Sequence, residues 1–418
     1  MLAHGTCKLH TLSSDQNQYK KIYRTLSGDN KMTELDDELV NDALTAEAIR
    51  SLSNETNIYL IHDPSDIRKP YSIKAENLGK VRDLKNNIIN GYSTYNIIAI
   101  TPNSKSVHLI SHESYSNKDP KFLKAELVRK VESDKLKEDQ AYAKDIHDSG
   151  DWYNKKTLTK DRIQKVSADL KKTNNDQKIT HIMDREFDDD EYFSTISLQG
   201  DDFVVRAKKS RSADGATDSK VKKARLIDLS FSNQCIHKLQ KVRFKKTCYQ
   251  DATLLIEWQE CLDYTAVKIT AKTREGKEIF ANPMLLLTNK SVATEEQALL
   301  IYQIYLKRSR IETVFKFLKE GLGWEEMQLR NFLGIQRLLS FCFFIAAYLY
   351  KIGDQEVHDD YVILLARLGG GKGVVSKHYI LQGIKALLSK YRVDRFFEEY
   401  KPSEDTIENM ISVSGAAV

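Results

Sequence analysis

The sequence predicts an α/β protein with a central mixed sheet, helices on both faces of the sheet, and a β-rich block inserted into this plan. Two observations predict this class. Apolar runs of strand length alternate with helical segments through the first half of the chain. Residues 226–290 then contain several strand-like runs in succession, before a long helical pattern begins at Thr294, a residue suited to an N-cap.

The elements follow in order. Residues 1–55 are polar with two helical patches, and "NIYLIHDPSD" then predicts a short buried strand. The runs "YNIIAITP" and "SVHLISHES" predict two more strands. A charged helical stretch from Pro120 to Thr173 has Trp152 as a packing anchor, and "KITHIMD" and "DDFVVR" predict strands on either side of an acidic helix start.

Composition bounds the class of protein. Of 418 residues, 41% are hydrophobic and 29% are charged, which is the balance of a soluble globular chain. A net charge of +5 permits a nucleic-acid partner without requiring one. Five cysteines without a C-x-x-C pair argue against a disulfide framework, so we expect a cytoplasmic protein with free thiols. The most apolar run, Leu338–Tyr350, is too short to span a bilayer and predicts a buried core helix.

Two carboxylates stand where apolar strands are predicted to end. Asp63 closes "IYLIHD" and Asp184 closes "THIMD". In open α/β sheets, chemistry gathers at such strand ends. A carboxylate at this place is also a common turn residue or helix cap. Asp66 stands close enough to Asp63 to be an alternative, and we favour Asp63 because it directly follows the apolar run.

The helix after Thr294 adds a third carboxylate with cations beside it. At about 100° per residue, Tyr305, Arg308, Glu312 and Lys319 project within about 60° of one another, next to an apolar stripe. A solvated face with Glu–Lys pairs is the plainer interpretation. If Glu312 joined the two aspartates, the three charges would repel unless cations neutralised them. Mg²⁺ prefers such ligands, and two ions about 4 Å apart suit phosphodiester chemistry.

This spacing resembles a known family. Tyr305-x2-Arg308-x3-Glu312-x6-Lys319 resembles the Tyr-Arg-Glu-Lys signature of bacterial insertion-sequence transposases of the DDE type. "MDREFDD" around Asp184 and "IHDPSDIRKP" around Asp63 resemble the two aspartate motifs of the same group. The resemblance implies an RNase H-like fold and a metal-binding catalytic triad of Asp63, Asp184 and Glu312.

The resemblance also implies a reaction, cofactors and partners. It implies cut-and-paste transposition through a DNA hairpin, with two Mg²⁺ or Mn²⁺ ions per site, terminal inverted repeats and target DNA as substrates, and a homodimer assembled on DNA. Tyr305, Arg308 and Lys319 would contact phosphates. Trp258, the one tryptophan of the β-rich block, would receive a flipped base, with a core position as the alternative.

Basic residues near the predicted site complete the DNA-binding candidates. "RAKKSR" leaves a strand next to the expected site and should meet phosphates, unless it is an ordinary solvated loop. Arg185 either contacts DNA or pairs with "DDDE". The candidates here are Arg185, Lys208, Lys209 and Arg211.

The expected organisation follows from these assignments. An RNase H-like catalytic domain spans 56–205 and 291–352, and a β-rich insertion domain spans 206–290. DNA binding is considered for the helical region 1–55, and dimerisation for the helical region 353–418. Two other functions stay open: an RNase H-like nuclease without strand transfer, and a catalytically silent DNA-binding protein derived from a transposase.

Overall fold

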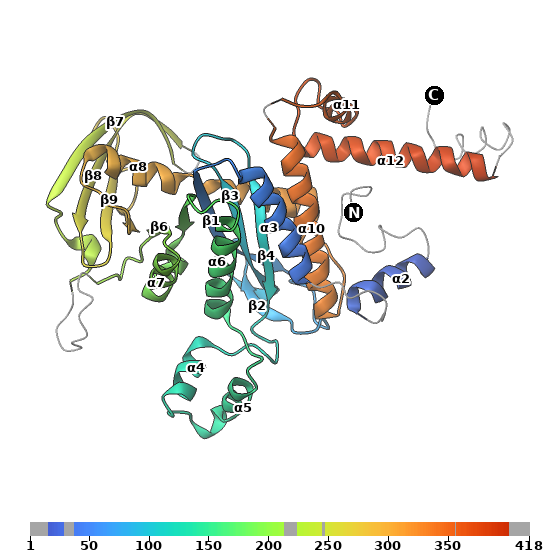
Figure 1. Ribbon diagram of the computed structural model, residues 1–418, viewed down its shortest axis with the longest axis horizontal. Coiled ribbons are helices and arrows are strands. Elements are labelled where there is room, and N and C mark those ends of the chain that lie inside the picture. The colour runs from blue at the N-terminus through green and yellow to red at the C-terminus, as the bar shows by residue number, and fades with distance from the viewer. Residues whose placement is uncertain (1–15, 29–36, 213–223, 245–246, 356, 401–418) are drawn as a thin grey trace.

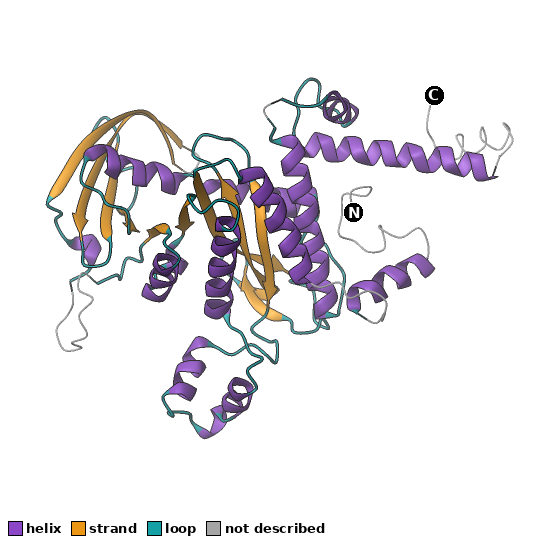
Figure 2. Cartoon of the chain, viewed as in Figure 1, coloured by secondary structure: helices purple, strands orange, loops and turns teal. Residues whose placement is uncertain are grey.

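One mixed sheet runs through the molecule. The structure is a computed structural model that describes residues 16–28, 37–212, 224–244, 247–355 and 357–400 (Figure 1). The ends of the two predicted terminal regions, residues 1–15 and 401–418, lie outside these ranges. Within them, ten strands form a single sheet with helices on both faces (Figure 2), so the predicted α/β class is confirmed.

The first half of the sheet is partly antiparallel and partly parallel. Its strands lie in the order β4–β3–β1–β5–β6. The pairs β1–β3 and β3–β4 are antiparallel, whereas β1–β5 and β5–β6 are parallel. A short strand, β2, pairs with the first residues of β3. The bounds are β1 Asn57–Arg68, β2 Gly79–Arg82, β3 Ile88–Ile100, β4 His108–Tyr115, β5 Lys178–Met183 and β6 Asp202–Arg206.

The β-rich block extends this sheet. Four antiparallel strands follow β6 in space in the order β10–β9–β8–β7. Strand β6 pairs with β5 along one edge and with β10 along its other edge. The antiparallel pairing of β10 with β6 therefore joins the four strands of the β-rich block to the central strands. The bounds are β7 Asn233–Phe244, β8 Thr247–Glu260, β9 Thr265–Lys272 and β10 Met284–Thr288.

Side chains of β1 alternate between two hydrophobic clusters, as expected for a sheet covered on both faces. Tyr59 and Ile61 join the cluster of helices α8 (Glu295–Leu306) and α10 (Phe332–Gly353). Ile58 and Leu60 join the opposite cluster, formed with α6 (Lys155–Lys171) and α7 (Asp190–Leu198). Most of the predicted strands therefore sit between two apolar layers.

Helix α10 contains the apolar run Leu338–Tyr350. In the described part of the chain it is the one helix long and apolar enough to cross a membrane. Leu338, Leu339, Phe343 and Leu349 are buried in the core beside β4. The prediction of a core helix is confirmed.

The helix predicted from Thr294 is not continuous. Thr294 caps it as expected, in a capping box with Gln297. Helix α8 ends at Leu306, and α9 (Ser309–Lys316) begins after a two-residue break and leads into a π-helical turn, Phe317–Gly321. At the break, backbone hydrogen bonds join residues three apart, as in a 3₁₀ turn, instead of four apart as in an α-helix; one example is Arg308 N to Tyr305 O at 3.0 Å. The side chain of Lys307 is held by the Pro102 carbonyl oxygen at 2.7 Å, which helps to fix this break.

Helices at the edges complete the molecule. Helix α3 (Asp37–Leu52) packs on β4, and α2 (Gln16–Ser27) packs on α10. Helices α4 (Ala125–Glu132) and α5 (Tyr142–Asp148) form a satellite below the sheet in Figure 1, with a small core against which Trp152 packs, as predicted. Helix α11 (Asp360–Leu368) packs against α12 (Lys377–Tyr400), and α12 projects from the body.

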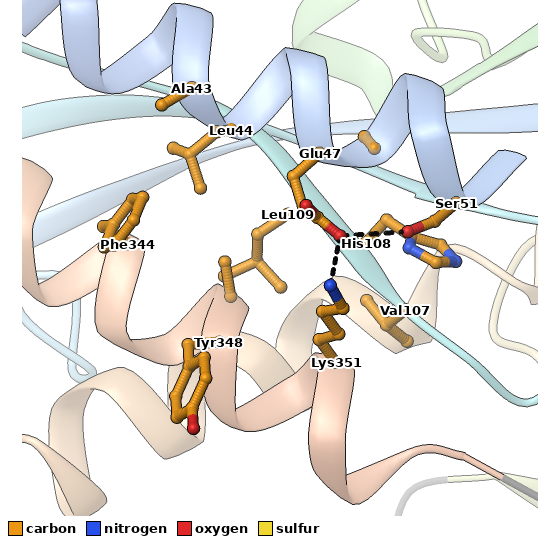
Figure 3. Close-up of a pocket in the computed structure, with 12 residues that line it drawn as sticks. Ala43, Leu44, Glu47, Ser51, Val107, His108, Leu109, Phe344, Tyr348 and Lys351 are labelled. Carbon is orange, nitrogen blue, oxygen red and sulfur yellow. Dashed lines mark hydrogen bonds and ion pairs between the residues drawn. The ribbon is translucent and has the colours of Figure 1, made fainter.

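A cavity of about 220 Å³ lies between α3, α10 and β4 (Figure 3). Its walls are mainly apolar, with Leu44, Leu109 and Phe344 among them. Glu47 and Lys351 form an ion pair across it at 2.6 Å. The cavity is built from elements that carry none of the candidate site residues.

A buried histidine in this core predicts acid sensitivity. His112 on β4 lies between Trp324 and Phe343, and burial lowers its pKa to about 3. When folding lowers the pKa of a histidine, its contribution to the free energy of unfolding is complete at pH values above the unfolded-state pKa, which is near 6.5. This contribution is lost progressively as the pH falls below that value. At pH 5 the loss is about 2 kcal/mol in the free energy of unfolding.

Urea denaturation at pH 7.5 and pH 5 measures this loss. We expect the difference between the two pH values to be smaller in His112→Gln by about 2 kcal/mol, because the variant has no group to protonate there. His378→Gln is the matched control, since His378 is exposed on α12. An unchanged pH difference in His112→Gln would contradict the assignment.

Candidate active site

Backbone pairing brings Asp63 and Asp184 together. The parallel ladder of β1 and β5 ends at the pair His62–Met183, and each aspartate is the next residue of its chain. Asp184 directly follows its strand, as predicted, and its Oδ1 accepts from the Arg185 amide at 2.7 Å. The prediction that β1 ends at Asp63 is wrong. The strand continues to Arg68 because β3 still pairs with it there, although β5 has ended.

One guanidinium touches three carboxylates. Arg308 Nη1 lies 2.9 Å from Asp63 Oδ2, and Nη2 lies 3.7 Å from Asp184 Oδ2 and 3.0 Å from Glu312 Oε1. Arg308 and Asp63 are largely buried, whereas the Glu312 side chain is 60% exposed. The structure therefore gathers the three acids, which come from β1, the end of β5, and α9, around a single point.

Asp66 is oriented elsewhere. Its carboxylate accepts from the Arg82 amide and from Ser93 Oγ, both at 3.3 Å. Three residues along a strand reverse the direction of a side chain, so Asp66 and Asp63 point to opposite faces. Of the two, Asp63 is the one that contacts Arg308.

The other two residues of the predicted helix face behave differently from each other. Tyr305 is buried, and its hydroxyl lies 3.4 Å from Asp184 Oδ1. Lys319 lies in the π-helical turn and reaches β1, where it donates to the Asp66 carbonyl oxygen at 2.9 Å and pairs with Glu325 at 3.4 Å. The predicted common face therefore holds for Tyr305, Arg308 and Glu312, while Lys319 lies farther along β1.

Burial sets the electrostatics of the site. It raises the pKa of Asp63 to about 7, against the lowering effect of Arg308, and repulsion from Asp184 and Glu312 adds to the rise. Burial also raises the pKa of Tyr305 to about 12, with a further contribution from Asp184. Tyr305 therefore stays a neutral hydroxyl donor at physiological pH. The pKa of Arg308 is raised by the three acids in spite of burial, so its charge is fixed.

A buried hydrogen-bonded chain joins β1 and β5 close to where the two aspartates follow in sequence. His62 bonds Tyr95 at 2.6 Å and His181 at 2.9 Å, and His181 bonds Asp201 at 3.1 Å. Lys171 pairs with Asp201 where the chain approaches the surface. Since His62 and His181 belong to β1 and β5, this chain ties together the two strands from which the carboxylates emerge.

Comparison with known proteins decides the family. A family model for the transposase DDE domain matches residues 60–349, which contain all three acids. This chain belongs to that family. A search of curated proteins gave no match. The mixed sheet with its flanking helices is consistent with the RNase H-like fold that the sequence resemblance implied.

A basic cavity lies at Arg185, the residue that follows Asp184. It has a volume of about 260 Å³ and is lined by the cationic side chains of Arg185, Arg206 and Lys209. Phe280 and Met284 supply apolar walls. Arg206 also shares a hydrogen bond with Tyr305. The sequence candidates did not include Arg206, Phe280 or Met284. A signal for Arg206 was present, because it is the last residue of β6 and the first of the basic run "RAKKSR".

Two of the basic candidates are engaged within the protein. The Lys208 amide and ammonium contact Asp188, at 2.7 and 2.9 Å. Arg211 pairs with Asp188 at 3.0 Å and with Asp190, and it lies over the rings of Phe193 and Tyr264. These contacts hold the basic segment onto the acidic start of α7. Lys209 is exposed, and Arg185 is half-exposed, 4.0 Å from Asp184.

Trp258 does not stand at the site. Only 5% of it is exposed, and it belongs to the same hydrophobic cluster as Ala298 and Ile301 of α8. The expectation that its ring receives a base does not fit this position, because a stacking platform needs an open face. The alternative of a core residue describes it correctly.

Proposed function

We propose that this protein is a metal-dependent DNA transposase in which Asp63, Asp184 and Glu312 form the catalytic triad. The convergence of the three carboxylates on Arg308, within 2.9–3.7 Å of its nitrogens, carries the proposal. Side chains from three separate segments do not gather in this way to solvate a surface. Membership of a transposase family agrees with DNA as the partner.

Within the residues that the structure describes, no group of three or more His, Cys, Asp and Glu side chains is placed to hold a metal ion, but the chemistry of the three acids fits Mg²⁺ or Mn²⁺. All three groups are carboxylates, which are the hard oxygen donors that these ions select, and a cation already lies among them in the form of Arg308. Asp63, Asp184 and Glu312 would hold two such ions, which supply an activated water or 3′-hydroxyl and stabilise the leaving oxygen.

The remaining side chains would bind the scissile region of the DNA. Arg308 offers a fixed charge and a planar fork, which suits a phosphate as well as a carboxylate. Tyr305 offers a neutral hydroxyl donor from its buried position, and Lys319 offers a point charge farther along β1. Together they would align one strand across the triad for attack by water and then by the freed 3′-hydroxyl on the opposite strand, which closes a hairpin.

We further propose that the basic cavity beside Asp184 receives a nucleotide displaced from the helix, in place of Trp258. Its cations would contact a phosphate and its apolar walls would contact a base. With 2-aminopurine next to the cleaved end, we expect Arg206→Gln to lose most of the fluorescence gain that wild type shows on binding. Lys277→Gln is the control, because Lys277 is an exposed lysine outside the cavity. Equal gains in both variants would remove the cavity from the reaction.

A cleavage assay separates the three functions considered. A labelled duplex that carries the element's terminal repeat is incubated with the protein, Mg²⁺ and a target plasmid. Hairpins and strand-transfer products support the proposed transposase, whereas nicks alone support a nuclease. DNA binding without any Mg²⁺-dependent cutting supports a silent relative, which the presence of all three acids disfavours.

Assembly and location follow as proposals of the same function. We propose that the protein acts in the cytoplasm at the nucleoid, as a homodimer on DNA. We also propose the domain limits given in the sequence analysis, and we propose that residues 1–55 bind the ends of the transposon DNA. Helix α2 supports that role, since Lys20, Lys21 and Arg24 are exposed on a helix without acidic residues. Light scattering of the DNA complex tests the dimer.

A further inference from the structure

Two loops at the far end of β1 present apolar side chains to solvent. The first, residues 69–78, joins β1 to β2, and the second, residues 83–87, is the turn between β2 and β3. We call them together the β1–β3 tip. Tyr71 is 96% exposed and Ile73 80% on the first loop, and Leu84 is 91% exposed on the second. Ile88, where β3 begins, is 68% exposed.

These side chains are exposed although their loops are firmly held. In the first loop, the Ser72 carbonyl oxygen accepts from Asn90 at 2.7 Å, and Glu76 bonds the Phe332 amide at 2.8 Å. In the second, the Asp83 carboxylate accepts from the amides of Lys85 and Asn87, both at 2.8 Å. A fixed backbone that holds large apolar groups in water costs free energy, which suggests that a partner covers them.

The charge of the tip indicates what that partner is. Lys74, Lys80, Arg82 and Lys85 are all exposed. The nearby acids are engaged in contacts within the protein, although Glu76 stays exposed: Asp83 closes its own turn, and Glu76 accepts from Asn331 and Phe332 at the start of α10. An outward surface of cations with apolar and aromatic tips complements the phosphates and grooves of duplex DNA.

The tip is also fixed relative to the candidate active site. β1 carries Asp63 and ends at Arg68, five residues or about 17 Å farther along the strand. Arg68 forms a two-point pair with Glu325 at 2.7 and 2.8 Å, and Glu325 also pairs with Lys319. A duplex that ran from the triad along β1 would meet the start of the tip about half a helical turn away.

We propose that the β1–β3 tip is a second DNA-contacting surface, in which Tyr71 and Leu84 enter a groove while Lys74 and Lys85 contact phosphates. The proposal rests on the proposed function for its choice of DNA. The duplex at the tip belongs either to the transposon end or to the target, and both present the same chemistry.

Binding of full-length protein to a fluorescent 30-base-pair mixed-sequence duplex in EDTA tests the surface without catalysis. We expect Tyr71→Ser with Leu84→Ser to weaken binding about tenfold at an unchanged salt slope, because apolar side chains in a groove neutralise no phosphate and release no counterions. Lys74→Gln with Lys85→Gln should lower the salt slope by about 2, since each phosphate contact contributes about 0.9. Leu262→Ser is the control, because Leu262 is also 96% exposed but lies at the β8–β9 turn.

The outcomes are distinct. Wild-type affinity and slope in both double variants, with unchanged thermal melting, would overturn the proposal. A change of oligomeric state in Tyr71→Ser with Leu84→Ser, at unchanged DNA affinity, would overturn it in favour of contact between two copies. If cleavage of the labelled end falls, the tip holds transposon DNA; if only strand transfer falls, it holds target DNA. Protein that binds DNA through the tip but never cuts would defeat the proposed function and leave this inference standing.

Discussion

Replacing Glu312 by glutamine is expected to reduce DNA cleavage by more than about 100-fold, since the loss of even an outer partner of a metal ligand costs 10–100-fold. The side chain is 60% exposed and, among the described residues, forms an ion pair with Arg308 only, so the fold should tolerate the change. DNA affinity should stay within about twofold, because a carboxylate does not attract phosphate. Gel analysis of a labelled end with Mg²⁺, beside a binding titration, measures both effects.

Glu320→Gln is the matched control for this experiment. Glu320 lies in the adjoining π-helical turn, is 68% exposed and pairs with Lys316 at 3.8 Å. It should cleave at the wild-type rate. Mg²⁺-dependent cutting by Glu312→Gln at the rate of this control would refute the triad.

Arg308→Ala is expected to have an effect of similar size by another route. It removes a fixed charge from the centre of three acids, and the loss of one such donor typically costs about 10²–10³ in rate. It should also weaken DNA binding and lower the salt slope by about 0.9, the value of one phosphate contact. Cleavage kinetics and a salt titration of the dissociation constant measure the two effects.

Arg308→Lys separates charge from geometry. A lysine keeps the charge but cannot make the fork that reaches both Asp63 and Glu312, so binding should recover more fully than cleavage. A salt slope in Arg308→Ala equal to that of wild type would rule out a phosphate contact and leave Arg308 a purely internal partner of the acids.

The carboxylate positions show how far sequence patterns carry. Asp184 could be placed because an apolar run ends at a strand end where both neighbours, β1 and β6, pair with β5. Asp63 could be selected but not placed correctly, because its strand continues with polar residues that only β3 accompanies. A hydrophobic pattern reports burial, and the burial of β1 is interrupted from Asp63 to Asp66 before it returns at Ile67.

The errors beyond the triad have a common physical cause. Helical periodicity placed Tyr305, Arg308 and Glu312 on one face, but Lys307 at the tightened turn and Lys319 in the π-helical turn contact Pro102 and Asp66, both distant in sequence. The same holds for Arg211, a DNA-binding candidate from sequence, whose partners Asp188 and Asp190 lie before and at the start of α7. Long-range pairing of charges leaves no local signal in a sequence.

The parallel ladder of β1 and β5 has a consequence for how such a protein can diversify. The two aspartates are brought together by the pairing of β1 with β5 and not by the segment between them, so the intervening satellite of α4 and α5 can lengthen, shrink or be replaced without displacing either one. A peptide tag spliced into the surface turn between Asp134 and Lys137 should therefore leave catalysis intact. One extra residue between Met183 and Asp184 should silence it, because it would carry one aspartate away from the other.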